Sequence, residues 1–239
     1  MRREHHPLWV ERALDHFTRA WAERFLLPQF DRIGAEPRFC GQKWIQIQGP
    51  NIRAGDNLHV FATRHAPVSL CVNPYDGGVG YIAIGSWCVI SAGVRIRSAI
   101  GVEIGDNCML AESSLITDAD WHDIYHRILP GKREPVRIGN NVWVGDRVTI
   151  CKGVTIGDNS VIGAASVVTK DVPPNTIAAG NPARPVGEID PTLPGSRREH
   201  LFVGGRPYDD FKDAYDRQRL HGNTLRGWLR ALVRPSRTS

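Results

Sequence analysis

Residues 138–172 read IGNNVWVGDRVTICKGVTIGDNSVIGAASVVTKDV, and they decide the fold because they repeat with a period of six. An aliphatic residue recurs at every sixth position: Ile138, Val144, Ile150, Ile156, Ile162 and Val168. Four residues after each of these stands a small or β-branched residue: Val142, Val148, Val154, Ser160, Ser166 and Val172. A period of six fits neither a helix of 3.6 residues per turn nor an alternating strand. It fits a short strand followed by a turn, repeated along the chain.

Three such units form one triangular coil, and successive coils stack as parallel strands about 4.8 Å apart. Each sixth residue then points into the prism, where Ile and Val suit a buried strand. The turns fall at residues 139–141 and 157–159, which hold only Gly, Asn and Asp, the residues that best tolerate a left-handed backbone. The repeat therefore predicts an all-β fold, a parallel β-helix.

The same period runs through earlier residues. Aliphatic residues six apart occur at Ile84, Ile90 and Ile96 and, after an offset of two, at Ile104, Leu110 and Ile116; the small positions that belong to them are Cys88, Val94, Ile100, Cys108, Ser114 and Asp120. Ile52 and Leu58, also six apart, place the start of the repeat near residue 45. We therefore expect an N-terminal helical cap over residues 1–44, a β-helix domain over 45–186, and a linker with a C-terminal helical tail over 187–239.

The chain carries a formal net charge of +5 and five cysteines. The charge would favour an anionic ligand, but no nucleic-acid-binding motif accompanies it, so we expect no nucleic-acid partner. The cysteines lack CxxC or zinc-site spacing, and we expect reduced thiols, with Cys88 and Cys108 as small buried residues. The first residues lack the apolar core of a signal peptide, and no stretch is apolar over the length of a membrane span. We therefore expect a cytoplasmic protein.

Both chain ends predict amphipathic helices. Near the N-terminus, Val10, Leu14, Phe17, Trp21 and Phe25 are four, three, four and four residues apart, and Pro28 would end that helix. We expect it to cover the N-terminal end of the β-helix. Near the C-terminus, Leu225, Trp228, Leu229 and Leu232 alternate with Arg226, Arg230 and Arg234. A basic amphipathic helix can lie on an anionic membrane, but we favour packing against the assembly, or disorder, over membrane contact.

The repeat breaks between Ile116 and Ile138, because these two residues are 22 positions apart, which is not a multiple of six. A loop that leaves a rigid scaffold is a common place for function. The excursion, residues 118–137, contains His122 and His126. A neutral imidazole, with an ordinary pKa near 6.5, can remove a proton at neutral pH. His122 is our candidate for such a base, and for His126 we favour a surface role.

The run over residues 138–186 resembles the C-terminal coils of the hexapeptide-repeat acyltransferases, which include galactoside, maltose and antibiotic acetyltransferases; the likeness is looser over residues 82–137. The resemblance implies left-handed coils, against the general handedness of parallel crossovers. It also implies a homotrimer with sites in the clefts between subunits and acetyl-coenzyme A as the acyl donor. In the string Thr117-Asp118-Ala119-Asp120-Trp121-His122, it implies that His122 is the general base.

Further site residues follow from the same resemblance. It implies coenzyme A contacts at Asp146 (through its main chain), Ala164, Thr169, Lys170 and Arg184, the last three near the nucleotide end. Asn141 and Trp143 are candidate cleft-lining residues, although Trp143 could equally pack against a neighbouring subunit. No serine or cysteine stands in a nucleophile elbow, so direct transfer without an acyl-enzyme is the simpler mechanism. We expect no metal.

These observations lead to an acetyl-coenzyme A-dependent acyltransferase, with the hydroxyl of a saccharide or glycolipid as the favoured acceptor. One alternative is a γ-type carbonic-anhydrase-like zinc protein. That activity needs three histidine ligands, and only His122 and His126 lie close together in the sequence. The other alternative is a catalytically inactive β-helix scaffold, in which His122 would be incidental.

Overall fold

The computed structural model describes residues 4–73, 78–204 and 207–233. The chain divides into two compact units. The β unit consists of residues 25–199, and the helical unit consists of residues 1–24 together with residues 200–239.

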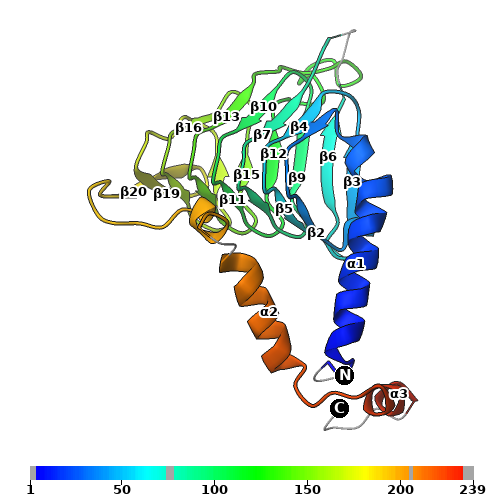
Figure 1. Cartoon of the computed structure of the whole chain (residues 1–239). Helices are drawn as coiled ribbons and strands as arrows, with labels where there is room; N and C mark the ends of the chain where they lie inside the picture. The colour runs from blue at the N-terminus through cyan, green and yellow to red at the C-terminus, as the bar shows by residue number, and fades with distance from the viewer. Residues whose placement is uncertain (1–3, 74–77, 205–206, 234–239) are drawn as a thin grey trace. The chain divides into compact units, whose positions relative to one another are not determined.

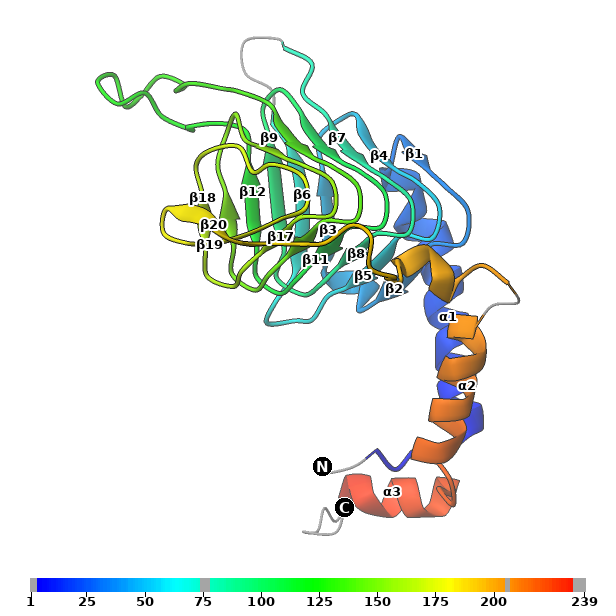
Figure 2. The same cartoon turned by 90° about the vertical axis from the view of Figure 1, so that its left-hand side faces the viewer.

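The β unit is a left-handed β-helix with three parallel sheets, here called faces A, B and C (Figures 1 and 2). Face A holds β1 (Arg32–Ile33), β4 (Ile52–Ala54), β7 (Ile82–Ile84), β10 (Val102–Ile104), β13 (Val136–Ile138) and β16 (Thr155–Ile156). Face B holds β2 (Arg38–Cys40), β5 (His59–Phe61), β8 (Val89–Ile90), β11 (Met109–Leu110), β14 (Trp143–Val144), β17 (Val161–Ile162), β19 (Thr176–Gly180) and β20 (Ala183–Glu188). Face C holds β3 (Ile45–Gln48), β6 (Val68–Val72), β9 (Arg95–Ser98), β12 (Leu115–Thr117), β15 (Thr149–Ile150) and β18 (Val167–Val168).

One strand from each face forms a coil, so that β1–β3 make coil 1 and β16–β18 make coil 6. We call the turns between consecutive strands corner AB, corner BC and corner CA. The sixth residues of the repeat stack in register, for example Ile104 on Ile138 and Ile138 on Ile156. The inward residues of coils 3 to 6 are all at most 5% exposed: Ile84, Ile104, Ile138, Ile156, Ile90, Leu110, Val144, Ile162, Ile96, Ile116, Ile150 and Val168. This confirms the core predicted from the period, in which each such side chain contributes about 1.5–3 kcal/mol.

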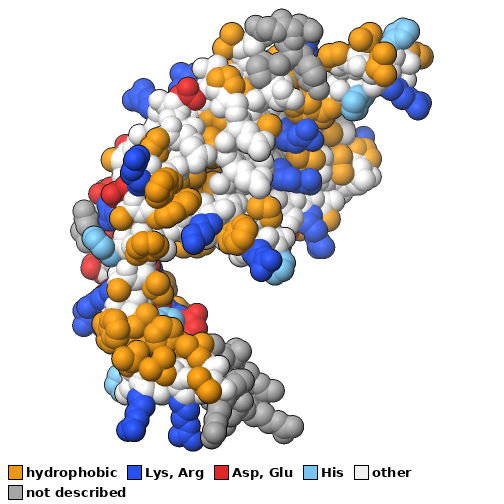
Figure 3. All heavy atoms as spheres, turned by 90° about the vertical axis from the view of Figure 1, so that its right-hand side faces the viewer, with side chains coloured by type: hydrophobic (Ala, Val, Ile, Leu, Met, Phe, Trp, Pro, Cys, Tyr) orange, Lys and Arg blue, Asp and Glu red, His pale blue; other side chains and the backbone are white. Residues whose placement is uncertain are grey.

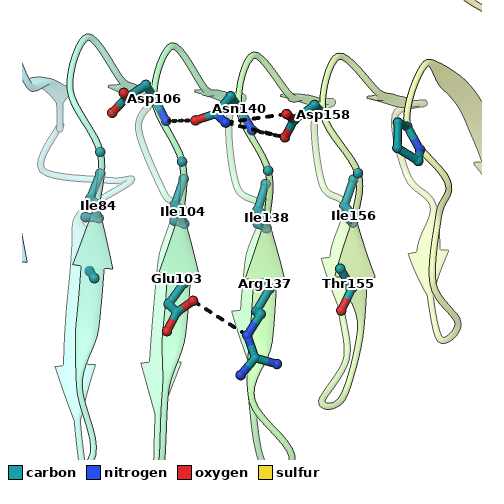
Figure 4. A pocket seen from close by; sticks show the side chains of 16 residues that line it. Ile84, Glu103, Ile104, Asp106, Arg137, Ile138, Asn140, Thr155, Ile156 and Asp158 are labelled. Carbon is teal, nitrogen blue, oxygen red and sulfur yellow. Dashed lines mark hydrogen bonds and ion pairs between the residues drawn. The ribbon is translucent and has the colours of Figure 1, made fainter.

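Corner AB shows why the turns need Gly, Asn and Asp. Asn141 and Asn159 have positive φ angles of 55° and 58°, as the sequence predicted. The turns are also bonded to one another along the corner (Figure 4): the Asn140 backbone N–H donates to Asp158 Oδ1 at 2.7 Å, and the Asp106 N–H donates to Asn140 Oδ1 at 2.9 Å. A Cβ at Gly139 would lie 2.2 Å from Asp158 Oδ1, so only glycine fits there.

The ends of the β-helix differ from the predicted boundaries. β1 and β2 pair with the second coil and precede residue 45, so the strands begin earlier in the chain than the predicted start. At the other end, β20 pairs antiparallel with β19 and extends to Glu188. The short 3₁₀ helices of the chain are η1 (Leu27–Gln29), η2 (Gln42–Trp44) and η3 (Arg198–Leu201). The first residues of η3 return to corner AB, where Arg198 Nε donates to the Trp87 carbonyl at 2.9 Å.

The helical unit contains α1 (Leu8–Phe25), α2 (Pro207–Arg219) and α3 (Leu225–Val233) (Figure 1). α1 matches the predicted N-terminal helix, and α3 matches the predicted basic helix; α2 lies in the predicted tail. Whether α1 covers the N-terminal end of the β-helix stays a prediction. Among the described helices, none is both long enough and apolar enough to cross a membrane.

His59 gives the β unit a predicted sensitivity to acid. Burial, followed by the positive charges of Arg198 and Arg38, lowers the pKa of His59 to about 3. Because the unfolded chain would hold this proton near pH 6.5, the free energy of unfolding should fall as the pH drops below that value, by up to about 1.4 kcal/mol per pH unit. His59→Gln should flatten this slope between about pH 6.5 and 5 in urea denaturation. The matched variant is His65→Gln, because His65 is exposed; an equal flattening by both variants would refute the prediction.

Candidate active site

The broken repeat forms an arm, residues 118–135, that leaves corner CA between β12 and β13 (Figure 2). Its two sides run antiparallel, with a bridge between Ala119 and Arg133. The Asp120 N–H donates to the Lys132 carbonyl at 2.8 Å, and the Gly131 N–H donates to the Asp120 carbonyl at 3.0 Å. The excursion is therefore a hydrogen-bonded hairpin, and β13 begins at Val136, one residue before the predicted end of the loop.

Asp118 ties the base of the arm to the preceding coil. Its side chain is fully buried and accepts four hydrogen bonds at corner CA of coil 3. The donors are the Ser98 hydroxyl at 2.8 Å and the backbone N–H groups of Ala99, Ile100 and Gly101 at 2.7, 2.9 and 2.6 Å. A carboxylate can accept this many bonds because it has only acceptor sites. Asp118 thereby fixes the point at which the arm begins.

The following coil holds the same base from the other side. Lys152, at corner CA of coil 5, forms an ion pair with Asp120 at 2.8 Å, and its side chain is only 22% exposed. The Gly153 N–H donates to the Glu134 carbonyl at 3.0 Å. The repeat phase predicted Asp120 at a small core position, and this prediction is wrong. The chain has left the prism by residue 120, and the Asp120 side chain pairs with Lys152 outside the core.

Trp121 fixes the residue before the candidate base. Its indole Nε1 donates to Thr117 Oγ1 at 3.1 Å, and the guanidinium carbon of Arg97 lies 4.4 Å from the ring centroid. Thr117 belongs to β12 and Arg97 to the neighbouring β9. The ring is thus held against the outer side of face C by a hydrogen bond and a cation–π contact.

His122 is exposed on the arm, and its Nδ1 lies 2.7 Å from the Arg127 carbonyl oxygen. A carbonyl oxygen only accepts, so Nδ1 carries the proton and the Nε2 lone pair stays available to a substrate. A main-chain carbonyl therefore orients the imidazole. His126 is also exposed, in agreement with its expected surface position.

Asp123 closes the turn that brings Arg127 back to His122. Its Oδ1 accepts from the backbone N–H groups of Tyr125 and His126, both at 2.8 Å. The bond from His126, followed by the bond from Tyr125, lowers the pKa of Asp123. The carboxylate therefore stays ionised and keeps the turn closed at neutral pH.

The residues predicted to contact coenzyme A lie at the two edges of face C and on β20. Asp146 and Ala164 occupy corner BC in successive coils, where the Ala165 N–H donates to the Asp146 carbonyl at 2.7 Å. Thr169 and Lys170 follow β18 at corner CA, the corner that carries the arm. Arg184 belongs to β20 on face B. The outward, half-buried residues between the two corners are Leu115, Thr149 and Val167.

Lys170 and Arg184 are exposed, and neither is ion-paired within the described part of the chain. Arg184 donates one hydrogen bond, from Nη1 to the Ala183 carbonyl at 2.8 Å. Two cations that no carboxylate neutralises suit the phosphate groups of an anionic ligand. Their chemistry therefore fits the nucleotide end of coenzyme A.

The two candidate cleft-lining residues lie apart from the arm. Asn141 is at corner AB, where its Nδ2 donates to Asn159 Oδ1 at 3.0 Å, so its side chain belongs to the ladder between turns. Trp143 points outward from β14 on face B and is 49% exposed. Within this single chain, neither residue lies at the corner that carries His122.

A groove of about 720 Å³ runs across the outside of face A (Figure 4). β7, β10, β13 and β16 line it, and none of the predicted site residues does. Its charged groups are bonded to each other: Arg137 lies 3.6 Å from Glu103, and Asn140 lies between Asp106 and Asp158. The groove holds no imidazole or thiol, so we assign the candidate active site to the arm.

Among the residues that the structure describes, one group of three side chains could hold a metal ion, and it comprises Glu11, Asp15 and Asp216. It lies in the helical unit, where Lys212 and Arg219 form ion pairs with its carboxylates. His122 and His126 therefore meet no third ligand within the described chain.

Two family models match the repeat. Residues 135–170 match the bacterial transferase hexapeptide model of six repeats, and residues 96–112 match the hexapeptide repeat of succinyl-transferases. Among curated proteins, the galactoside O-acetyltransferase of Escherichia coli K12 is 49% identical over 92 residues, which cover 37% of this chain and 45% of that protein. The match therefore spans less than half the length of this relative.

Solved structures extend the likeness over more of the chain. A maltose O-acetyltransferase from Clostridium difficile 630 is 33% identical over 68% of this chain and 70% of its own, with a TM-score of 0.39. A hexapeptide-repeat acetyltransferase from Vibrio cholerae, solved with acetyl-coenzyme A, is 26% identical over 72% of this chain and 78% of its own, with a TM-score of 0.45. The identity to the maltose O-acetyltransferase is thus above 30% over more than two thirds of its length. The chain belongs to the hexapeptide-repeat acetyltransferase family.

Sequence reasoning missed the groups that position His122. The Arg127 carbonyl has no side-chain signature, and Trp121 and Lys152 resemble ordinary surface residues in the sequence. For Asp118 the sequence does hold one signal. Asp118 is the second residue after Ile116, just as Ser98 is the second residue after Ile96 in the preceding coil. Both side chains are fully buried, so residue 118 still occupies the equivalent place in its coil.

The buried Asp118 supports a prediction about the arm. Asp118→Asn replaces one acceptor oxygen by an NH₂ group that faces N–H donors, and it should lower the free energy of unfolding by about 1–3 kcal/mol. It should also speed hydrogen exchange at the Asp120 and Gly131 amides of the arm. The matched variant Asp123→Asn, at the tip of the arm, keeps an oxygen that can accept from the Tyr125 and His126 N–H groups, so it should change stability less. Equal protection of these amides in the wild type and in Asp118→Asn would contradict this prediction.

Proposed function

We propose that the protein is an acetyl-coenzyme A-dependent O-acetyltransferase that acylates a hydroxyl of a saccharide or glycolipid by direct transfer. The observation that carries the proposal is the imidazole of His122, whose Nδ1 is bonded to the Arg127 carbonyl and whose Nε2 is free. Family membership and the 49% identity to a galactoside O-acetyltransferase support the reaction and the class of acceptor.

The proposed mechanism needs a single base. Acetyl-coenzyme A would supply an acetyl group activated as a thioester. His122 Nε2 accepts the proton of the acceptor hydroxyl while that oxygen bonds to the carbonyl carbon. As the carbon–sulfur bond breaks, the imidazolium of His122 returns the proton to the leaving thiolate. The products are the acetyl ester and free coenzyme A, and no residue of the chain is acylated.

The arm supports this role because it limits the movement of the base. Asp118 and Lys152 hold its two sides to different coils, and Asp123 closes its tip. A base held in one tautomer and one position avoids the cost of ordering it during the reaction. The Arg127 carbonyl also stabilises the imidazolium that forms when Nε2 takes the proton, since it accepts from Nδ1 in both charge states.

We further infer a homotrimer, as expected for this family. Face B supports this inference because it carries an outward row of apolar residues in register: Met109, Trp143, Val161 and Ile177. Trp143 is 49% exposed in the single chain, and a neighbouring copy would cover it. We propose that no metal takes part in the reaction.

Replacement of His122 tests the base. His122→Ala should lower kcat by roughly 100-fold or more and leave the KM for acetyl-coenzyme A unchanged, because a general base acts in the transition state. His126→Ala is the matched control and should retain near-normal turnover. The assay follows free thiol release with a panel of saccharide acceptors. A His122→Ala enzyme with near-normal kcat would eliminate the assignment.

The donor can be tested without knowledge of the acceptor. Calorimetric titration with acetyl-coenzyme A should show saturable binding near one site per chain. Lys170→Ala and Arg184→Ala should each weaken this binding roughly tenfold, since each would lose a charge-assisted phosphate contact. Acetylpantetheine, which lacks the nucleotide phosphates, should bind the wild type and both variants equally, and exposed Arg64→Ala should behave as the wild type. Absence of acetyl-coenzyme A binding would overturn the proposed function.

A further inference from the structure

The helical unit is held together mainly by charged side chains. Arg12 of α1 pairs with Asp213 of α2 at 2.8 Å, and Lys212 of α2 pairs with Asp15 of α1 at 2.6 Å. The residue numbers rise along α1 as they fall along α2, so the two helices are antiparallel. Two acidic residues of α2, Asp213 and Asp216, thus form ion pairs within the unit itself.

α3 is attached to this unit along one side only. Before the helix, Asn223 Nδ2 donates to the carbonyls of Glu4 and His6 at 3.0 and 3.1 Å. Within it, the Trp228 ring meets the His6 ring edge-on at 6.2 Å between centroids, and Ala231 is buried. Trp228 and Ala231 are three residues apart, so they define the inner side of α3.

The remaining apolar side chains of α3 face away from this contact. Leu225, Leu229 and Leu232 are four and three residues apart and form one stripe, here called the leucine stripe. They are 44%, 52% and 52% exposed. Hydrophobic side chains gather at this end of the helical unit, with Lys or Arg side chains beside them (Figure 3). Packing within the described chain therefore leaves the leucine stripe uncovered.

The charged side chains beside the leucine stripe are all positive. Arg226 and Arg230 each follow a stripe leucine by one residue, so they line its edge, and both are exposed. Neither is ion-paired within the described residues. From residue 217 to the end, the sequence contains six arginines and no Asp or Glu. A partner for this surface must accept apolar side chains and carry negative charge along the edge of the apolar contact.

We propose that α3 docks on the surface of an anionic lipid bilayer. The leucine stripe enters the boundary between headgroups and acyl chains, and Arg226 and Arg230 bind lipid phosphates at the same depth. A guanidinium suits this position because it is planar, always charged and able to bind phosphate oxygens in pairs. The helix lies in the plane of the interface, since its nine residues are far too few to span the bilayer.

The test is flotation of the full-length protein with vesicles. Phosphatidylcholine vesicles that contain phosphatidylglycerol should bind the wild type, vesicles of phosphatidylcholine alone should not, and added salt should weaken binding. Arg226→Glu with Arg230→Glu should lower the partition coefficient by roughly 25-fold or more, because each arginine near an anionic surface contributes about fivefold. Leu229→Gln with Leu232→Gln should lower it by at least roughly tenfold through lost apolar insertion.

A charge-matched control separates docking from net charge. Arg53→Glu with Arg64→Glu makes the same change at exposed positions of the β unit and should retain binding. Circular dichroism checks that each variant is folded, and light scattering gives its mass. The proposal is overturned by equal binding to both kinds of vesicle, by no binding to either, or by equal loss in the control. It is also overturned if the leucine variant lowers the oligomeric mass, because the stripe would then contact a second copy of the chain.

Discussion

The interior of the β unit is a stack of aliphatic side chains, with each of the three faces contributing in coils 3 to 6, and the position of each depends on the coil below it. Ile104, Ile138 and Ile156 stand one above the other on face A with a single register. A shift by one residue would turn these side chains outward, so the stack fixes the phase of every strand. It also fixes where the chain may depart from the repeat: an insertion within a strand would break the stack, whereas an insertion at a corner leaves it intact.

The arm satisfies this constraint. It leaves the prism at corner CA after Thr117 and returns at Val136, and the strands on either side keep their partners in face A and face C. Where the chain leaves the prism, at the base of the arm, backbone N–H groups of the preceding corner would be buried without hydrogen-bond acceptors. Asp118 accepts from three of them. The same carboxylate therefore completes the β-helix and anchors the segment that carries His122.

The sequence could predict the structural features that follow directly from the six-residue period. The inward residues, the left-handed Asn141 and Asn159 turns and the place of the arm all depend on local spacing, and the structure agrees with them. It could not predict the contacts that depend on how the arm folds back. The Arg127 carbonyl reaches His122 only because Asp123 closes a turn, and Lys152 reaches Asp120 only because coil 5 stacks above the base. Asp120 was placed in the core for the same reason, since the period does not say at which residue the chain leaves the prism. The roles of Asp146, Ala164, Thr169, Lys170 and Arg184 rest on resemblance, because exposed corner residues carry no signal of their ligand.

His122 and the carbonyl that fixes its tautomer are five residues apart in one hairpin, and the turn between them is closed by a residue of the same hairpin. The chemistry of the imidazole is thus set inside the arm, while Asp118 and Lys152 set only its position on the prism. The arm is in this sense a cassette. Exchange of the segment at the Ala119–Arg133 bridge between β-helices with the same corner would carry His122 together with its orienting carbonyl. Descendants of such a chain could alter the surrounding surface without having to rebuild the proposed proton-transfer group.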